Sequence, residues 1–305
     1  MASLKTAGAA DTMRDQMART LEDLMAHDER LAVVLADIST SQLKGVFRAY
    51  PERTINVGIM EQTMIGVCAG LAMEGFIPVA HSITPFLVER PYEQLKDDFC
   101  YQRLGGNFIS IGASYDYSTE GMTHHGTGDV PILRTLPGME IVVPGTPDEF
   151  DTLFREAYAD GAPTYFRLSA RRNAEDRPVR FGRLDVVRQG SRGTVLAVGP
   201  MLDVTMAAIA GLDLTVLYCA TIAPFDAETL RANATTGDIV VVEPYYAGAL
   251  VPDVAAALRD RRTRVESIGV PRAVLTRYGT PEHHDAALGL TPEGIGARIR
   301  RFLDA

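Results

Sequence analysis

The sequence predicts an α/β protein with two domains, each built on a mainly parallel sheet flanked by helices. Short apolar, β-branched runs alternate with longer amphipathic segments, as in strand–helix–strand crossover units. The alternation stops in a charged stretch after residue 169 and restarts near residue 194. A chain of 305 residues is also long for a single core. We therefore expect domains at 1–175 and 191–305, joined by a linker at 176–190.

The strand candidates of the first domain are short runs rich in Val, Ile and aromatic residues. They occupy residues 31–37, 54–57, 77–81, 108–112, 140–144 and 164–168. Helix-like segments lie between most of them, beginning with "AADTMRDQMARTLEDLMAH" at 9–27. Strands separated by helices run parallel, so we expect a mainly parallel sheet.

The second domain repeats this alternation on a smaller scale. Its strand candidates are 194–199, 214–219, 238–243 and 264–268. Helices are expected from Met201 and near 248–259. In the last segment, "TPEGIGARIRRFL", Thr291 is a suitable N-cap and Glu293 lies in the first turn.

Composition excludes several classes of function. The net charge of -9 and a pI near 5.2 argue against nucleic acid or an anionic membrane as partner. No run approaches the roughly 18 apolar residues of a membrane span, and the N-terminal segment lacks a signal-peptide core. The three cysteines have no CxxC spacing, so we expect neither a disulfide framework nor a zinc site, and a cytoplasmic location.

One carboxylate stands in an otherwise apolar segment. Glu61 lies in "RTINVGIMEQTMIGVCAGLAMEG", just past the strand at 54–57, where the next helix begins. Ligand crevices in parallel sheets form at the carboxyl ends of the strands. Glu61 is therefore either a site residue or a solvated carboxylate stabilised by the helix dipole, and spacing alone leaves both interpretations open.

Several motifs carry a resemblance to a known family. "PERTINVGIMEQTMIGVCAGLAMEGFIPVAHSITPFLVERPYEQL" resembles the pyrimidine-binding domain of transketolases and deoxyxylulose-phosphate synthases, and "EGMTHHG" is similar to the family's Gly-x-Thr-His loop. "GAPTYFRLSARRN" is similar to the end of that domain, and "DIVVVEP" followed by "AGAL" resembles the family's C-terminal domain. The resemblance covers nearly the whole chain and implies an enzyme dependent on thiamine diphosphate.

The resemblance assigns cofactor contacts to several residues. It implies that Glu61 hydrogen-bonds the ring nitrogen of the aminopyrimidine and so promotes loss of the thiazolium proton. Phe86 matches best as the aromatic that packs on the pyrimidine, and Tyr92 is a second candidate, although aromatics at this spacing are often plain core. Asp37 and Ile38 end the first strand and are candidates to contact the cofactor, with core packing equally open for Ile38.

The stacking position has an alternative. Depending on the alignment, the family's stacking residue falls at Glu89 or Arg90 in this sequence.

Other residues match the family's substrate site. His124 is implied to line the substrate channel, where it donates to a sugar hydroxyl or moves a proton. Glu120 stands where transketolases have an aspartate that contacts a substrate hydroxyl, and a further histidine is replaced near Gly112. Arg171 matches the arginine that binds a substrate phosphate, and Arg14 matches a second phosphate contact.

From the residues alone, the loop and linker positions also fit solvated surface features. A histidine pair on a Gly-flanked loop is as often surface as site, and an arginine pair in a linker is usually solvated. His283 and His284 in "PEHHDAALG" are expected to form an exposed helix start.

The family's diphosphate motif is missing from the sequence. The dipeptides Gly128-Asp129 and Gly237-Asp238 are not followed by glycine, as a GDG motif requires. The resemblance therefore implies a partner, a transketolase N-terminal-half subunit that carries the GDG motif and binds Mg²⁺ or Ca²⁺. This chain is expected to supply no metal ligand, to form a homodimer, and to share the thiamine diphosphate with that subunit.

The predicted function is transfer of a two-carbon ketol unit from a ketose or ketose phosphate to an aldehyde. A decarboxylating synthase or the β-subunit of a 2-oxoacid dehydrogenase is the alternative enzyme. A non-catalytic binding subunit is the alternative from another class. The GMTHHG loop and Arg171 favour a transketolase over the dehydrogenase.

Overall fold

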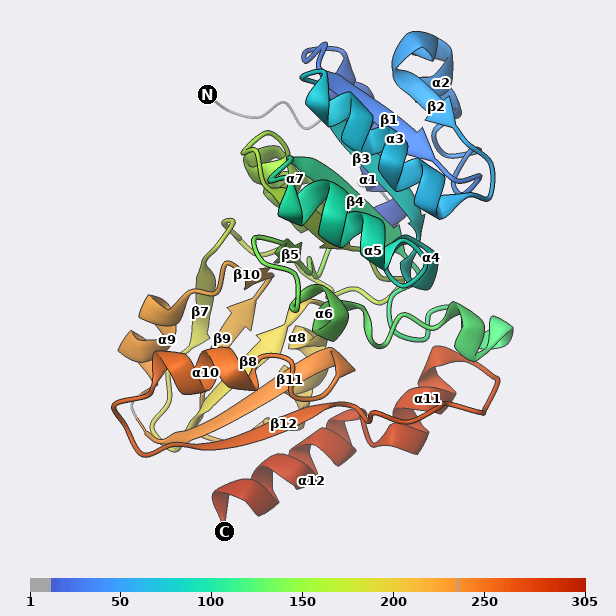
Figure 1. Cartoon of the computed structure of the whole chain (residues 1–305). Coiled ribbons are helices and arrows are strands. Elements are labelled where there is room, and N and C mark those ends of the chain that lie inside the picture. Colours follow the sequence, from blue (N-terminus) through green and yellow to red (C-terminus); the bar gives the residue numbers. More distant parts are fainter. Residues whose placement is uncertain (1–11, 235) are drawn as a thin grey trace.

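The computed structural model describes residues 12–234 and 236–305, which form two sheets stacked along the long axis of the molecule (Figure 1). The larger sheet has the strand order β10-β5-β6-β4-β3-β1-β2, and the smaller has β12-β11-β8-β9-β7. All pairings are parallel except those of the outer strands β10 and β7. The predicted fold class, two α/β domains on mainly parallel sheets, is confirmed.

The strands of the larger sheet follow the predicted apolar runs. They are β1 (Leu31–Leu35), β2 (Thr54–Asn56), β3 (Ile77–Ile83), β4 (Gly106–Ile111), β5 (Glu140–Val142) and β6 (Pro163–Arg167). The seventh strand, β10 (Thr221–Ala223), comes from the second half of the chain and pairs antiparallel with β5. The two halves of the chain are therefore joined by backbone hydrogen bonds as well as by side chains.

The smaller sheet contains one strand that the sequence did not predict. Its members are β7 (Leu184–Arg188), β8 (Thr194–Val198), β9 (Thr215–Cys219), β11 (Asp238–Tyr246) and β12 (Arg264–Val270). The range predicted as linker, 176–190, therefore includes β7. This strand lies at the sheet edge with only Leu184 fully buried, so it lacks the apolar run by which the other strands are recognised.

Helices cover both faces of the larger sheet. On one face, α1 (Met13–Met25) packs against α7 (Pro147–Ala157), and on the other lie α3 (Glu61–Met73) and α4 (Thr84–Val88). The remaining helices are α2 (Lys44–Ala49), α5 (Tyr92–Gln94), α6 (Asp129–Leu133), α8 (Leu202–Ala208), α9 (Ala227–Asn233), α10 (Val251–Ala257), α11 (Pro281–Leu288) and α12 (Pro292–Leu303). The helix predicted over 9–27 begins outside the described residues.

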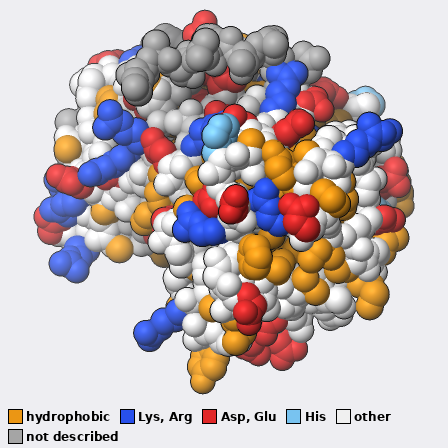
Figure 2. Space-filling view, turned by 90° about the horizontal axis from the view of Figure 1, so that it is seen from above, with side chains coloured by type: hydrophobic (Ala, Val, Ile, Leu, Met, Phe, Trp, Pro, Cys, Tyr) orange, Lys and Arg blue, Asp and Glu red, His pale blue; other side chains and the backbone are white. Residues whose placement is uncertain are grey.

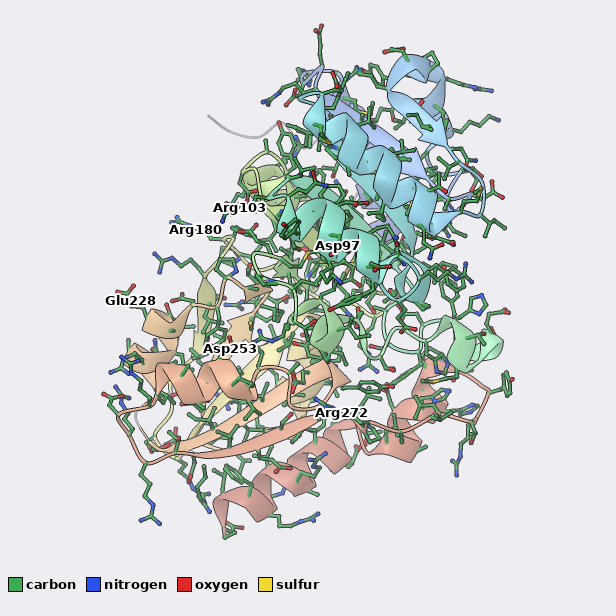
Figure 3. The ribbon with its side chains drawn as sticks, viewed as in Figure 1. Asp97, Arg103, Arg180, Glu228, Asp253 and Arg272 are labelled. Atoms are coloured by element: carbon green, nitrogen blue, oxygen red, sulfur yellow. The ribbon has the colours of Figure 1, made fainter. Side chains whose placement is uncertain are left out.

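Side-chain caps fix several helix starts. The hydroxyl of Thr12 accepts from the Asp15 N–H at the start of α1, and Thr291 accepts from Gly294 at the start of α12, as predicted. Across the domains, Arg134 pairs with Asp253 of α10, which projects toward the first domain (Figure 3). Among the helices of the described residues, none has the length and apolar character to span a bilayer.

The surface seen from above carries charges of both signs. Lysine and arginine side chains alternate with aspartate and glutamate on the part of this face that is visible (Figure 2). A mixed surface lacks the uniform positive field with which proteins attract nucleic acid.

Candidate active site

Glu61 is the first residue of α3, and its side chain is only 5% exposed. The turn that precedes it is sharp because Gly58 adopts a φ of 73°, a conformation that favours glycine. The two residues before Glu61 are apolar yet exposed, with Ile59 at 71% and Met60 at 57%. The acidic side chain is therefore buried and the two apolar side chains beside it are exposed, which is the reverse of the usual distribution of residue types.

A surface hollow of about 290 Å³ opens beside Glu61, lined by residues 59–63 and Arg90. Nη1 of Arg90 donates to Oε1 of Glu61 at 2.8 Å. The same guanidinium lies over the ring of Phe86, 3.8 Å from its centroid. Arg90 thus bridges the predicted carboxylate and the predicted stacking aromatic.

His124 lies next to Phe86, with ring centroids 5.0 Å apart in an edge-to-face arrangement. It ends a 3₁₀ turn, Met122–His124, and its Nδ1 lies 3.0 Å from the hydroxyl of Thr123. The structure therefore brings Glu61, Phe86 and His124 into one contiguous group. Glu120 is exposed in the preceding 3₁₀ turn.

Tyr92 makes different contacts. Its hydroxyl is 2.6 Å from that of Thr135, and its ring packs against the core between the larger sheet and its helices. Of the two aromatic candidates, Phe86 is the one whose ring lies under the guanidinium that pairs with Glu61.

Arg14 begins a buried hydrogen-bond chain that the sequence did not reveal. Its Nε donates to the hydroxyl of Ser39 at 2.8 Å, which lies 2.6 Å from Nε2 of His81. Nδ1 of His81 is 2.7 Å from the carbonyl of Ile109, so Nδ1 carries the proton and Nε2 accepts from Ser39. Burial lowers the pKa of His81 to about 4, which keeps the ring neutral and consistent with this chain.

The backbone of the loop after β1 is strained. Asp37 and Ser39 have φ values of 67° and 63°, which are uncommon for residues other than glycine. Asp37 is exposed and exchanges hydrogen bonds with the Asn56 side chain, while Ile38 packs against the core. Neither Asp37 nor Ile38 lines the hollow beside Glu61.

Tyr117 lies between Arg14 and His124. Its ring is in edge contact with that of His124, with centroids 6.4 Å apart. Burial raises the pKa of Tyr117, and the nearby charge of Arg14 opposes that rise. The ring also covers Gly112, where an added Cβ would come within 2.3 Å of it. Tyr117 therefore fills the space beside the position where the family's further histidine is replaced.

Arg171 lies in a different pocket, of about 270 Å³, between the two domains. Its Nη2 donates to Oδ2 of Asp285 on α11. The predicted phosphate contacts thus have different surroundings: Arg14 donates to the hydroxyl of Ser39, and Arg171 pairs with a carboxylate.

Matches to two family models decide the family. Residues 10–175 match the transketolase pyrimidine binding domain, and residues 182–295 match the transketolase C-terminal domain. The chain belongs to the transketolase family.

Curated relatives of this transketolase-family chain include components of split enzymes. A 33.6 kDa protein of the fasciation locus of Rhodococcoides fascians is 42% identical over 288 residues, covering 93% of this chain and 92% of that protein. One of the subunits of the apulose-4-phosphate transketolase of Actinobacillus succinogenes is 30% identical, covering 74% and 78%. The chain spans about half of 1-deoxy-D-xylulose-5-phosphate synthase 2 of Geobacter sulfurreducens, 31% identical over 97% of this chain and 50% of that protein.

A solved structure of a split-gene transketolase, described as an inactive β4 tetramer, is similar over nearly the whole chain. The TM-score is 0.85 at 27% identity, covering 97% of this chain and 99% of that one. The prediction that this chain corresponds to the C-terminal-half subunit of a split transketolase is confirmed. A thiamine-diphosphate-dependent, transferase-type role follows for the family to which it belongs.

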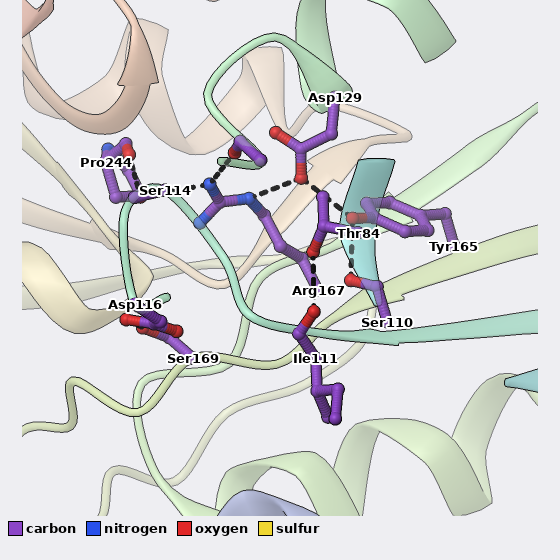
Figure 4. Close-up of polar contacts among 11 residues, drawn as sticks. Thr84, Ser110, Ile111, Ser114, Asp116, Asp129, Tyr165, Arg167, Ser169 and Pro244 are labelled. Atoms are coloured by element: carbon purple, nitrogen blue, oxygen red, sulfur yellow. Dashed lines mark hydrogen bonds and ion pairs between the residues drawn. The ribbon is translucent and has the colours of Figure 1, made fainter. Parts of the chain in front are cut away.

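A fully buried ion pair supports the loop that carries His124 (Figure 4). Nε of Arg167, at the end of β6, donates to Oδ2 of Asp129 at 2.7 Å, and both side chains are at most 1% exposed. Arg167 also donates to the Ser114 hydroxyl and the Gly126 carbonyl, at either end of the loop. The strand was predicted from its apolar residues, but its arginine was not singled out.

His125 and His284 meet between the transketolase domains. Their ring centroids are 5.4 Å apart, and Tyr115 stacks on His284 at 4.9 Å. The expectation that both histidines of the 283–284 pair are exposed is wrong for His284, which is 3% exposed. His283 is exposed as predicted. The contact with the loop that carries His125 buries the side chain of His284. Neighbouring residues of a helix point in different directions, so the side chain of His283 stays exposed.

We expect His125 to contribute stability that is present above pH 6.5 and is lost as the pH falls toward 4. Burial, reinforced by His284 and His124, lowers the pKa of His125 to about 4, against about 6.5 when unfolded. In this window the unfolded state binds more protons at this residue, so protonation of His125 favours unfolding.

The measurement is urea unfolding at a series of pH values for the wild type and His125→Gln. The free energy of unfolding of the wild type minus that of the variant should decrease as the pH falls through this window, because glutamine does not titrate. Buried carboxyls such as Asp116, whose pKa is raised to about 6, act in the opposite direction, but they are common to both proteins. A wild-type minus variant difference that is independent of pH contradicts the assignment, and His27→Gln, at an exposed position, is the control.

Proposed function

We propose that this chain is the pyrimidine-binding half of a two-subunit transketolase. It would transfer a two-carbon ketol unit from a ketose to an aldehyde, with thiamine diphosphate bound between it and a partner that holds the diphosphate and a divalent metal. The observation that carries the proposal is the buried carboxylate of Glu61 at the wall of an open hollow, connected through Arg90 to Phe86 and His124.

The residues at the hollow fit an aminopyrimidine. A carboxylate that is itself buried makes a stronger hydrogen bond to a ring nitrogen than a solvated one, since the dielectric around it is lower. Arg90 orients Glu61 through Oε1, and the ring of Phe86 lies directly beyond the guanidinium. When bound, thiamine diphosphate supplies the nucleophilic carbon, while this chain supplies orientation and electrostatics.

His124 is the group we assign to proton movement at a substrate hydroxyl. Its Nδ1 is held by Thr123, so Nε2 remains for the substrate. Tyr117 lies next to His124, and Arg14 is close to Tyr117, so we propose that the rest of a sugar lies along these polar groups. Glu120 is proposed to contact a substrate hydroxyl from the exposed start of the same loop.

The hollow is open on the side of Ile59 and Met60, which supports a partner subunit. Exposed apolar residues at the rim of a polar site mark a surface that another protein covers. Among the residues that the structure describes, no group of three or more His, Cys, Asp or Glu side chains is arranged to hold a metal ion. We propose that the partner carries the GDG motif and the Mg²⁺ or Ca²⁺.

Helix α3 is the surface we propose for homodimerisation. Its outward side carries Gly66 and Gly70, where an added Cβ would have no neighbour within 4 Å, and ends at Met73, which is 66% exposed. The two glycines leave room on this side of the helix, which would allow two copies to approach closely about a two-fold axis. The cysteines are free, which supports action in a reducing compartment, the cytoplasm.

The test is a titration with thiamine diphosphate and Mg²⁺, with and without a copurified partner bearing a GDG motif. Because the cofactor would bridge two chains, we expect the complex to bind it at least about a hundredfold more tightly than the chain alone. The complex should then exchange two-carbon units between a ketose and an aldose.

Two outcomes contradict the proposal. The first is equal cofactor affinity with and without the partner. The second is a complex that releases carbon dioxide from a 2-oxoacid and transfers no ketol unit, which indicates the decarboxylating alternative. Omission of Mg²⁺ from the same mixture is the control for specific binding.

A further inference from the structure

We propose that Asp285 sets the charge preference of the pocket at Arg171, so that this pocket takes a neutral, hydroxyl-bearing part of a sugar rather than a phosphate. The inference rests on the proposed function for its substrate class, a sugar. It concerns the interdomain pocket of about 270 Å³ and not the hollow at Glu61.

Both ends of the Arg171 guanidinium are already engaged by the second domain. Nη2 donates to Oδ2 of Asp285, and Nη1 lies 3.3 Å from Sδ of Met201. The other carboxylate oxygen of Asp285 accepts from the hydroxyl of Tyr115, so the acid is fixed from both sides. A phosphate would therefore have to compete with Asp285 for the bidentate fork that makes arginine a phosphate ligand.

Displacing Asp285 is costly because its side chain is only 11% exposed. A phosphate that took over Arg171 would leave a largely buried carboxylate without its cation, and it would approach that carboxylate with a charge of the same sign. The Arg171 side chain is 30% exposed, so the unfavourable part falls mainly on the carboxylate, which is the more buried member of the pair. The pair thus discriminates against a phosphate by repulsion as well as by competition.

The pocket as a whole carries no excess of positive charge. Two guanidinium groups, those of Arg171 and Arg172, face three carboxyl groups, those of Asp116, Glu282 and Asp285. Burial raises the pKa of Asp116 to about 6. The net charge of these five groups is therefore zero when Asp116 is protonated and one negative charge when it is ionised. A dianionic phosphate is not attracted to such a pocket.

The same groups suit hydroxyls. Carboxylates, serine hydroxyls and a tyrosine line the pocket and accept or donate single hydrogen bonds to a polyol; they belong to Ser114, Tyr115, Asp116, Ser169 and Glu282. Arg14 offers the contrast, since its Nε donates to a neutral serine and the ion pairs of the described residues include none at Arg14. An anionic end of a substrate is therefore expected at Arg14.

The test uses the full chain alone in two titrations. Binding of inorganic phosphate is monitored by ³¹P NMR, and binding of the neutral pentitol xylitol is measured by calorimetry. Wild type should bind xylitol. Asp285→Asn, which frees Arg171, should bind phosphate at least about tenfold more tightly than wild type, as expected when a charged hydrogen bond becomes available. Adding Arg171→Gln to Asp285→Asn should abolish the gain.

The matched control is Glu282→Gln, which removes the same charge from an exposed position of the pocket rim. It should gain much less phosphate affinity than Asp285→Asn. Equal gains, a gain that survives Arg171→Gln, or no xylitol binding by the wild type each overturn the proposal.

A second variant covers the case in which Asp285→Asn does not fold, as judged by thermal unfolding. Arg171→Gln in the otherwise wild-type chain should leave phosphate affinity unchanged, whereas a loss overturns the proposal. Neither thiamine diphosphate nor the partner enters these titrations. A failure of ketol transfer in the assembled complex is therefore distinguishable from a failure of this inference.

Discussion

Replacing Glu61 with glutamine should lower the rate of ketol transfer by roughly a thousandfold, the scale of losing a positioned proton-transfer or electrostatic group. Glutamine has nearly the same shape and can still accept from Arg90, so the hollow should persist. The amide lacks the charge that strengthens a hydrogen bond to the ring nitrogen of the cofactor. The rate is measured in the complex with the partner, together with deuterium exchange at the thiazolium carbon.

The matched control for this prediction is Glu93→Gln on α5, which removes the same charge from an exposed position. It should retain the wild-type rate and exchange. If exchange in Glu61→Gln is as fast as in the wild type, Glu61 is not the activating carboxylate and the proposed function loses its main support.

Replacing Asp129 with alanine should lower the free energy of unfolding by about 3–5 kcal/mol, because it leaves the Arg167 guanidinium charged and buried without a counterion. Arg167 is completely buried, and its pairing with Asp129 is shared by the hydroxyl of Tyr165, which donates to the same oxygen at 2.7 Å. Chemical denaturation followed by circular dichroism gives the value.

The control is Asp238→Ala, which breaks an ion pair with Arg264 of similar length, 2.8 Å, but with the two side chains 25% and 43% exposed. Solvent screens that pair, so its loss should cost less than about 1 kcal/mol. Comparable losses in the two variants would mean that burial does not govern the strength of the Arg167 pair.

The fold was largely predictable because most strands are continuous apolar runs. Leu, Ala and Val fill β1, and Ile and Val fill residues 239–242 of β11, so both strands are buried on both faces there, as parallel strands between helix layers require. The strands that escaped prediction, β7 and β10, are an exposed edge and a three-residue segment. Their pairing depends on neighbours distant in the sequence, which a local pattern does not reveal.

The candidate site was predictable where a residue type was out of place. An acid among apolar residues pointed to Glu61, whereas nothing local distinguished Ser39 or His81, which meet Arg14 only after the chain has folded. The resemblance supplied Arg171 but not Asp285, which lies 114 positions away on another domain. Partners of this kind arise from tertiary structure alone.

Because β10 lies in the second half of the chain, the larger sheet cannot be completed until that part has been synthesised. The larger sheet takes its outermost strand from residues 221–223, well after the last of its own strands, β6, at residues 163–167. On the ribosome, the edge of β5 therefore stays open while about 50 further residues are made, a delay of several seconds at ordinary elongation rates. Nascent chains would expose that edge to other strands in this interval, so the second half of the chain serves as an internal cover for the first.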